Sequence, residues 1–304
     1  MIDGISVELT ELIGLQRYVQ KTIYQPKSRR SLHAGNHLSK LRGRGMDFAE
    51  VRNYQAGDEI RHMEWRVTAR TGRPHVKLYQ EERERPVVIL SDFNPSMYFG
   101  TRLAFKSVVA ARLAALIAWT VVKQGDRVGG LLFSAERHDE FIPRSRQAGV
   151  LTLLASLSQY TYGAMKKNDS LPKPLSEVLM RVRRVLRPGS ILVLISDFYN
   201  LDKDCEQHLS RLRAHNDILA YQIADPLELG PPKPGSYAMT DGKDELLLDT
   251  TITPVAEAYQ AYCETRIATL ETQFRRLGIQ QVQLTARDDL PLLVRQTFPR
   301  RTHV

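Results

Sequence analysis

The sequence predicts an α/β protein built on a doubly wound, mostly parallel sheet, and three observations carry this prediction. From residue 86 onward, short apolar runs alternate with helical patterns. Two of the runs, 87–91 and 190–196, are apolar enough to be covered on both faces, as parallel strands are. Each of these two runs leads into an aspartate, Asp92 or Asp197, so polar side chains gather where a central strand ends.

The individual elements follow from the same periodicities. The run 101–123 is apolar nearly all round, which predicts a buried core helix, whereas 147–160 and 174–186 are amphipathic. A hairpin is expected over 237–250, turned at Asp241-Gly242. Further helices are expected at 205–215 and 254–277, and strands at 86–92, 127–134, 139–143, 190–198, 217–225 and 279–286.

Length and composition allow one large core. The chain has 304 residues, of which 42% are hydrophobic. We expect a sheet domain over 86–304 and, over 1–85, an N-terminal extension packed on it. The net charge of +9 makes nucleic acid, an anionic membrane or an acidic protein surface a candidate partner.

The sequence features favour a cytoplasmic protein. The two cysteines, Cys205 and Cys263, lack metal-ligand spacing and suit free thiols in a reducing compartment. No signal peptide is visible, because the first residues are acidic. Lys106 and Arg112 interrupt the most apolar window, and the uncharged run 113–122 is far below the ~18 residues of a membrane span. No transmembrane segment is therefore expected.

A basic stretch precedes the sheet. No acidic residue occurs between Leu12 and Met46. One interpretation is a basic surface that grips an acidic partner; the other is a solvated linker. The cations expected on that surface are Arg29, Arg30, Lys40, Arg42 and Arg44.

The sequence "SDFNPSM" before a helix, with a later "VLISDF", resembles the von Willebrand factor type A fold, which is Rossmann-like. That fold carries a metal-ion-dependent adhesion site with the pattern D-x-S-x-S, a distant Thr and a second Asp. Asp92, Ser96 and Asp197 match the pattern, whereas Asn94 replaces the middle serine and only Ser170 is available for the Thr position. The resemblance thus implies a degenerate site; we expect no resident cofactor, with magnesium bound weakly if at all.

The segment 43–133 resembles the bacterial family called domain of unknown function 58. Its hallmarks are a G-x-G-x-[DE]-F start, R-x-Y-x-x-G-D, and R-x-x-[DE]-W before A-R. They stand here as Gly43, Gly45, Asp47, Phe48, Arg52, Tyr54, Gly57, Asp58, Arg61, Glu64, Trp65, Ala69 and Arg70.

The charges of this signature alternate in sign over a short span. We expect Arg52, Asp58, Arg61, Glu64 and Arg70, with Tyr54 and Trp65, to form a half-buried network that clamps the segment to the sheet domain. The alternative is that some of these side chains face outward and bind a partner.

Motifs of catalysis are absent from the sequence: there is no phosphate-binding loop, nucleophile elbow or H-E-x-x-H pattern. We therefore expect a non-enzymatic adaptor. The family resemblance implies partners, namely a MoxR-type AAA+ ATPase and other type A domain proteins, which together assemble or remodel client complexes. Two alternatives stay open. The first is a protein that binds nucleic acid or an anionic surface through residues 17–44, although no nucleic-acid-binding motif is present. The second is a metal-dependent hydrolase at Asp92 and Asp197.

Overall fold

The computed structural model describes residues 4–20, 46–81, 85–145, 147–162, 171–240 and 245–299. The chain divides into two compact units, one formed by residues 1–23 and 85–300 and the other by residues 24–84 and 301–304. This division differs from the expected boundary between residues 85 and 86. The N-terminal residues group with the sheet because Val7 and Leu12 are buried in its core.

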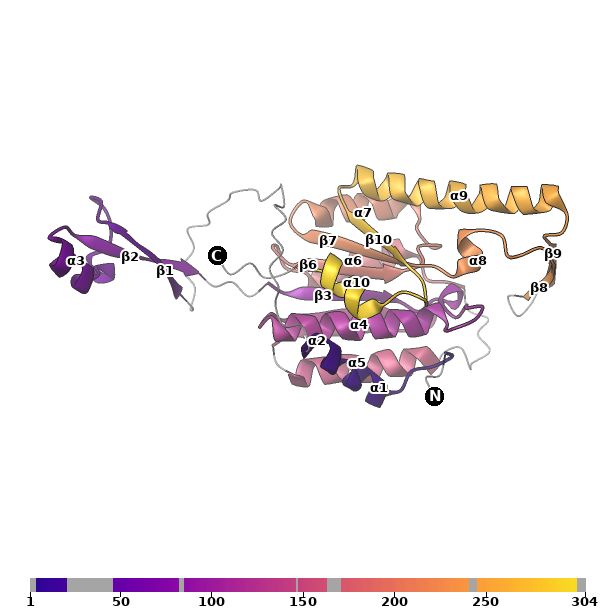
Figure 1. The fold of residues 1–304 in the computed structure, drawn as a ribbon, viewed down its shortest axis with the longest axis horizontal. Helices are drawn as coiled ribbons and strands as arrows, with labels where there is room; N and C mark the ends of the chain where they lie inside the picture. Colours follow the sequence, from indigo (N-terminus) through magenta and orange to yellow (C-terminus); the bar gives the residue numbers. More distant parts are fainter. Residues whose placement is uncertain are drawn as a thin grey trace. The chain divides into compact units, whose positions relative to one another are not determined.

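A six-stranded sheet forms the centre of the larger unit (Figure 1). Its strands are ordered β10-β7-β6-β3-β4-β5, and all neighbours pair in parallel except β4 and β5. The predicted fold class is confirmed. The strands are β3 (Val87–Asp92), β4 (Val128–Phe133), β5 (His138–Arg144), β6 (Ile191–Ser196), β7 (Asp217–Ile223) and β10 (Gln280–Leu284).

Helices cover both faces of this sheet. Successive side chains of β3 point to opposite faces, so Val87 and Ile89 join one core cluster while Val88 and Leu90 join the other. The first cluster contains α4 (Lys106–Lys123), α5 (Gln147–Thr161) and α10 (Leu290–Thr297). The second contains α6 (Leu175–Val185), α7 (Lys203–Arg213) and the C-terminal half of α9 (Thr253–Arg276).

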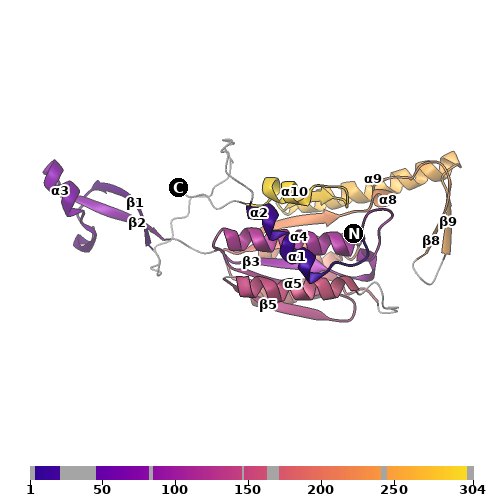
Figure 2. The ribbon, with the colours of Figure 1, turned by 60° about the horizontal axis from the view of Figure 1, so that its bottom comes forward.

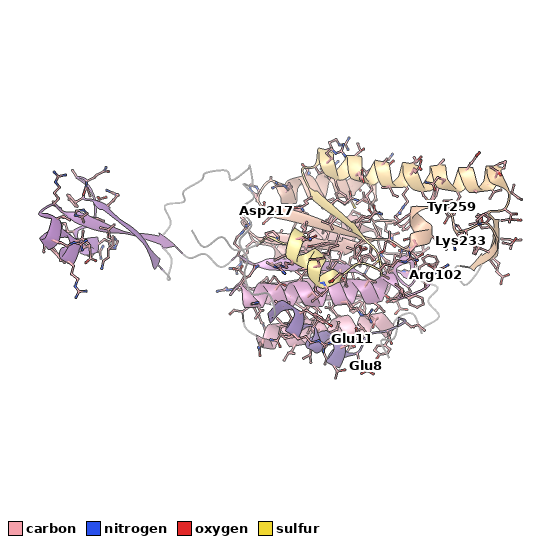
Figure 3. The ribbon with its side chains drawn as sticks, in the orientation of Figure 1. Glu8, Glu11, Arg102, Asp217, Lys233 and Tyr259 are labelled. Carbon is pink, nitrogen blue, oxygen red and sulfur yellow. The ribbon has the colours of Figure 1, made fainter. Side chains whose placement is uncertain are left out.

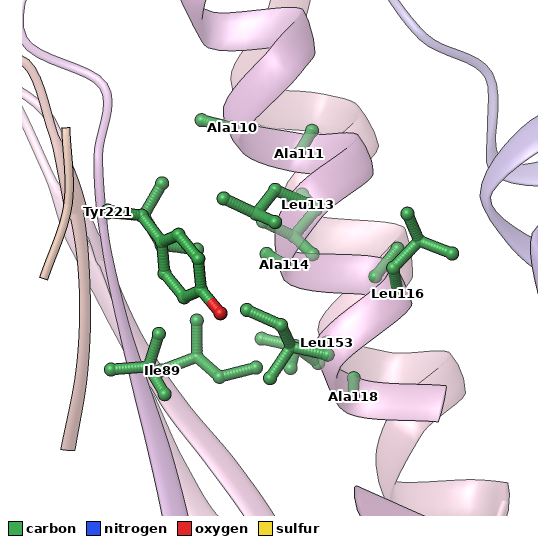
Figure 4. Packing of buried hydrophobic residues seen from close by; sticks show 14 of the residues in the cluster. Ile89, Ala110, Ala111, Leu113, Ala114, Leu116, Ala118, Leu153 and Tyr221 are labelled. Carbon is green, nitrogen blue, oxygen red and sulfur yellow. The ribbon is translucent and has the colours of Figure 1, made fainter. Parts of the chain in front are cut away.

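Helix α4 packs closely on the sheet because small side chains line it. Ala110, Ala111, Ala114 and Ala118 are all fully buried. Figure 4 shows the ring of Tyr221, from β7, between the sheet and this helix. Its hydroxyl lies 2.8 Å from Thr297 Oγ1 of α10, which satisfies the polar end of a buried aromatic side chain.

The N-terminal helices α1 (Leu9–Gly14) and α2 (Gln16–Gln20) lie against α4, and α1 also lies against α5 (Figure 2). Leu12 is fully buried there, and its carbonyl oxygen accepts a hydrogen bond of 3.0 Å from Trp119 Nε1. Arg112 Nε donates to Glu11 Oε1 at 2.6 Å. These contacts attach residues 4–20 to the sheet unit.

A short helix and a two-stranded hairpin lie beyond the carboxyl ends of the strands, between β7 and α9 in the chain. Helix α8 (Pro226–Leu229) begins with a capping box, in which Asp225 and Glu228 bond to each other's backbone N–H groups. Strands β8 (Ser236–Thr240) and β9 (Glu245–Asp249) pair as an antiparallel hairpin, as expected. The predicted turn at Asp241-Gly242 lies outside the described residues.

The smaller unit contains a two-stranded antiparallel sheet of β1 (Met46–Asn53) and β2 (His75–Glu81). Between these strands lie a 3-10 turn, η1 (Ile60–His62), and helix α3 (Trp65–Thr71). Helix α3 ends at Gly72, whose φ of 69° is the left-handed conformation that glycine adopts without strain. Within the described ranges of both units, no helix combines the length and the apolarity that crossing a membrane requires.

Candidate functional site at the carboxyl edge of the sheet

Asp92 and Asp197 lie at the same edge of the sheet. Asp92 is the last residue of β3, and Asp197 directly follows β6, its parallel neighbour. From β3 the chain crosses to β4 on one side, and from β6 it crosses to β7 on the other. Doubly wound sheets place their ligand sites at such a switch in direction. Both side chains are buried, with 2% and 1% of their surface exposed.

The carboxylate of Asp92 is held by groups from both strand ends. Its Oδ1 accepts from the backbone N–H of Asn94 at 2.8 Å, and its Oδ2 accepts from the Ser196 hydroxyl at 2.7 Å. Burial, and secondarily the nearby charge of Asp197, raises the pKa of Asp92 to about 7. The hydrogen bonds and the charge of Lys106 oppose this rise.

Asn94 joins two loops with its side-chain amide. Its Nδ2 donates to the carbonyl oxygen of Lys173 at 3.1 Å, and its Oδ1 accepts from the N–H of Lys173 at 2.9 Å. Both ends of the amide are thus bonded to one backbone residue before α6. Ser96 Oγ is buried, and within the described part of the chain it has no hydrogen-bond partner. Ser170 lies outside the described residues.

Lys106 was not predicted as part of this site, and it is the site's buried cation. Its side chain has 3% of its surface exposed. The ammonium nitrogen donates to Asp197 Oδ2 at 2.8 Å and to Glu228 Oε1 at 2.5 Å. It also lies 5.2 Å from the ring centre of Tyr199 and 5.9 Å from that of Phe99, at cation–π distance.

The loop that follows β6 is fixed around this lysine. Asp197 Oδ1 accepts from the N–H of Tyr199 at 3.1 Å, and its carbonyl oxygen accepts from Arg266 of α9 at 2.8 Å. The Arg266 guanidinium stacks 3.5 Å from the ring centre of Tyr199. Phe198 adopts a left-handed φ of 57°, unusual for a bulky side chain. This backbone conformation turns the chain so that Asp197 and Tyr199 both meet Lys106.

The side chains at this edge do not fit the divalent cation that the sequence resemblance implies. The amide of Asn94 is bonded at both ends to the backbone, and the carboxylate of Asp197 already faces the charge of Lys106. A metal ion at Asp197 would be repelled by this ammonium in a buried, weakly screened environment. No cluster of three or more His, Cys, Asp or Glu side chains suited to a metal occurs among the described residues. Of the predicted ligands, the Ser96 hydroxyl alone has no hydrogen-bond partner in the described structure.

The signature residues of the smaller unit form ion pairs only in part. Arg52 Nη2 lies 2.7 Å from Asp58 Oδ1, and this bond lowers the pKa of Asp58. Glu64 caps helix α3 through the N–H of Arg66 and forms an ion pair with Lys77, which is outside the signature. The expected network is therefore divided into separate pairs.

Three further signature side chains are exposed. Trp65 has 64% of its surface exposed, and Arg61 forms a solvent-exposed pair with Glu59 at 3.2 Å. Arg70 is exposed near the end of α3. Tyr54 is half-buried, and its N–H donates to the carbonyl oxygen of Pro74.

Several predicted residues lie outside the described part of the chain. They include the whole expected basic surface (Arg29, Arg30, Lys40, Arg42 and Arg44) and the first two signature glycines, Gly43 and Gly45.

Comparison with known proteins identifies the family. The family described as "Protein of unknown function DUF58" matches residues 50–268, more than half of the chain. The chain belongs to the DUF58 family. The prediction made from the motifs over 43–133 is thereby confirmed.

Similar proteins and similar structures extend this comparison. Uncharacterized proteins of Mycobacterium bovis and Mycobacterium tuberculosis are 29% identical over 272 residues, which cover 88% of this chain and 83% of theirs. Among solved structures, BatB of Bacteroides thetaiotaomicron has a TM-score of 0.44 at 14% identity and covers 70% of this chain and 96% of its own. The von Willebrand factor type A domain of SpRpn10 has a TM-score of 0.39 at 11% identity and covers 73% and 100%, respectively.

Proposed function

We propose that this DUF58 chain is a non-enzymatic cytoplasmic adaptor of the von Willebrand factor type A class. In this role it works with a MoxR-type AAA+ ATPase and other type A domain proteins to assemble or remodel a client complex. The observation that supports the proposal is the buried ammonium of Lys106 between Asp197 and Glu228. It gives the carboxyl edge of the sheet a buried cation that belongs to the chain itself and that faces two carboxylates.

This arrangement suits a rigid binding platform better than a hydrolytic site. A hydrolase at Asp92 and Asp197 requires an accessible carboxylate, or a metal with open coordination positions for water and substrate. Here Asp92 is 2% exposed and bonded to Ser196 and Asn94, and Asp197 is 1% exposed and bonded to Lys106 and Tyr199. The same bonds hold the loops after β3 and β6 in one conformation, which a docking surface requires.

Co-purification tests the adaptor role. The full chain, tagged, is co-expressed with the MoxR-type ATPase of the same organism and recovered with ATP or ADP. We expect stoichiometric co-elution on size exclusion that depends on the nucleotide. Absence of any complex with either nucleotide would contradict the partnership.

Two further assays address the alternative functions. Turnover of generic phosphoester, carboxylic ester and peptide substrates is measured with magnesium or manganese and with a chelator. Turnover that the chelator abolishes would favour the hydrolase. Binding of a single-stranded oligonucleotide that falls steeply between 50 and 200 mM salt would favour the nucleic-acid binder.

A further inference from the structure

A groove lies beside the Lys106 site. Its volume is about 550 Å³, and it is bounded by the loop after β3, by α8 and the segment that follows it, by β8, and by the loop after β10. Apolar side chains form most of its lining: Phe99, Pro226, Leu227, Pro231, Pro232 and Tyr237. An exposed apolar hollow of this kind is a candidate binding site.

Three cations border the groove. Arg102, Lys233 and Arg287 all line it, and all three are exposed. Figure 3 places Arg102 and Lys233 at the α8 and β8 end of the sheet, opposite Asp217 at the amino end of β7. Among the described residues, none of the three forms an ion pair.

Acidic groups close to the groove are engaged elsewhere. Asp225 accepts from the hydroxyl of Thr101 at 2.8 Å, and Glu228 accepts from Lys106. Asp288 and Asp289 follow Arg287, but they accept hydrogen bonds from the N–H groups of Thr285 and Leu292, respectively. Among the described residues none of these carboxylates forms an ion pair with the three cations of the groove, so the charged groups of Arg102, Lys233 and Arg287 can pair with an acidic occupant.

We propose that this groove binds an acidic peptide segment of a protein partner. Apolar side chains of the peptide contact the apolar lining of the groove, and its Asp or Glu side chains pair with Arg102, Lys233 and Arg287. The three cations favour acidic side chains in the occupant, and the proline and leucine side chains of the lining favour apolar ones. Strand β8 pairs with β9 on one side only in the described structure, so an extended peptide finds main-chain groups along its other edge.

The inference rests on the proposed protein-binding role, for which it names a surface and the chemistry of the partner. It also connects the groove to Lys106. Pro226 and Leu227 face the groove from the same short helix whose Glu228 binds the ammonium of Lys106. The lysine thus fixes one wall of the groove.

A peptide selection tests the inference without requiring the ATPase. A phage library of random 12-residue peptides is selected on the full chain, and the enriched peptides are synthesised with a fluorescent label. Affinities are then measured by anisotropy for the wild type and for the variant Arg102→Glu/Lys233→Glu/Arg287→Glu. The matched control is Arg183→Glu/Arg184→Glu/Arg187→Glu, which changes the net charge equally at exposed positions at and beyond the end of α6.

We expect enriched peptides that combine Asp or Glu with apolar residues. The groove variant should bind them at least tenfold more weakly, and the control within about twofold of the wild type. Circular dichroism and the unfolding midpoint show whether each variant is folded.

Three results would overturn the inference: no acidic enrichment, equal weakening by both variants, or displacement of the peptide by a 12-nucleotide oligothymidylate whose binding requires the same three cations. Failure of the adaptor role is distinguishable from these, because it appears as loss of ATPase co-elution while peptide binding by the purified chain persists.

Discussion

The residue that most distinguishes this site is Lys106, because it places an ammonium group where the sequence pattern suggests a metal. A buried ion pair contributes little net stability, since the desolvation of both charges offsets their attraction. Removing only one partner is costly, because it leaves the other charges buried and uncompensated. Two carboxylates, Asp197 and Glu228, depend on this ammonium.

Lys106→Met should therefore destabilise the chain by roughly 3–5 kcal/mol in urea unfolding. The matched control is Lys123→Met in the same helix, where the exposed ammonium donates, among the described residues, to the carbonyl oxygen of Val19; we expect a loss below about 1 kcal/mol. The triple variant Lys106→Met/Asp197→Asn/Glu228→Gln should recover part of the loss. Equal effects of the two lysine variants would contradict a structural role for the Lys106 ammonium.

Asp92 should make stability depend on pH. Burial and Asp197 raise its pKa in the folded state to about 7, far above the ordinary value of an aspartate, so the folded chain retains a proton that the unfolded chain has released. The stability of the wild type should consequently fall as pH rises from about 4 to about 7. Asp92→Asn, which resembles the protonated form, lacks this loss.

The difference in unfolding free energy between Asp92→Asn and the wild type is measured by urea titration at several pH values. The unfolding free energy of the variant, relative to that of the wild type, should rise by on the order of 2 kcal/mol between pH 5 and pH 7. Above pH 7 this difference should change little. A difference that is constant with pH would show that Asp92 is ionised throughout.

The sequence allowed part of this site to be predicted. The apolar runs before Asp92 and Asp197 place both aspartates at one edge of a parallel sheet. The ion pair was missed because Glu228 lies 122 positions from Lys106, and no local pattern joins them. One signal was available: a lysine in the first turn of an otherwise apolar helix is disfavoured by the helix dipole and requires an acidic partner.

At the scale of elements, Leu12 is the buried side chain of α1. Leu12 is 0% exposed and belongs to the core cluster, whereas the adjacent Ile13 is 36% exposed. Leu12→Ala should cost about 2–4 kcal/mol of unfolding free energy, and Ile13→Ala less than about 1 kcal/mol. Thermal unfolding followed by circular dichroism measures both. Similar effects of the two substitutions would mean that α1 does not pack as described.

The elements that could be predicted are those with long, uniform patterns. Strands β3 and β6 and helix α4 are buried on nearly every side, so their apolar runs define them. Strands β1 and β2 and helix α3 were not predicted, because charged residues interrupt any period and the strand partners are distant in sequence. Helix α10 was missed because its 8 residues are too few to establish a helical period.

At the scale of the whole molecule, each unit exposes side chains through which we propose that a partner binds. The larger unit has the cationic groove, and the smaller unit exposes Trp65 and Arg70 of the family signature. Exposed tryptophan and arginine side chains are frequent anchors of protein interfaces.

Trp65→Ala/Arg70→Ala should reduce capture of the proposed ATPase partner at least tenfold without shifting the unfolding midpoint by more than about 2 °C. The control is Arg66→Ala on the same helix, whose side chain is also exposed. Loss of capture by the control alone, or unfolding of the double variant, would contradict an interface role for these two side chains.

Calorimetric titration of the purified full chain with magnesium and with manganese tests most directly whether Lys106 supplies the cation of the carboxyl edge. A type A domain with a complete adhesion site, titrated in the same buffer, is the positive control. Because the ammonium already neutralises Asp197, we expect no binding isotherm at micromolar metal. A stoichiometric isotherm at micromolar metal that is lost in Asp92→Ala would show instead that Asp92, Asn94 and Ser96 hold an ion beside the lysine.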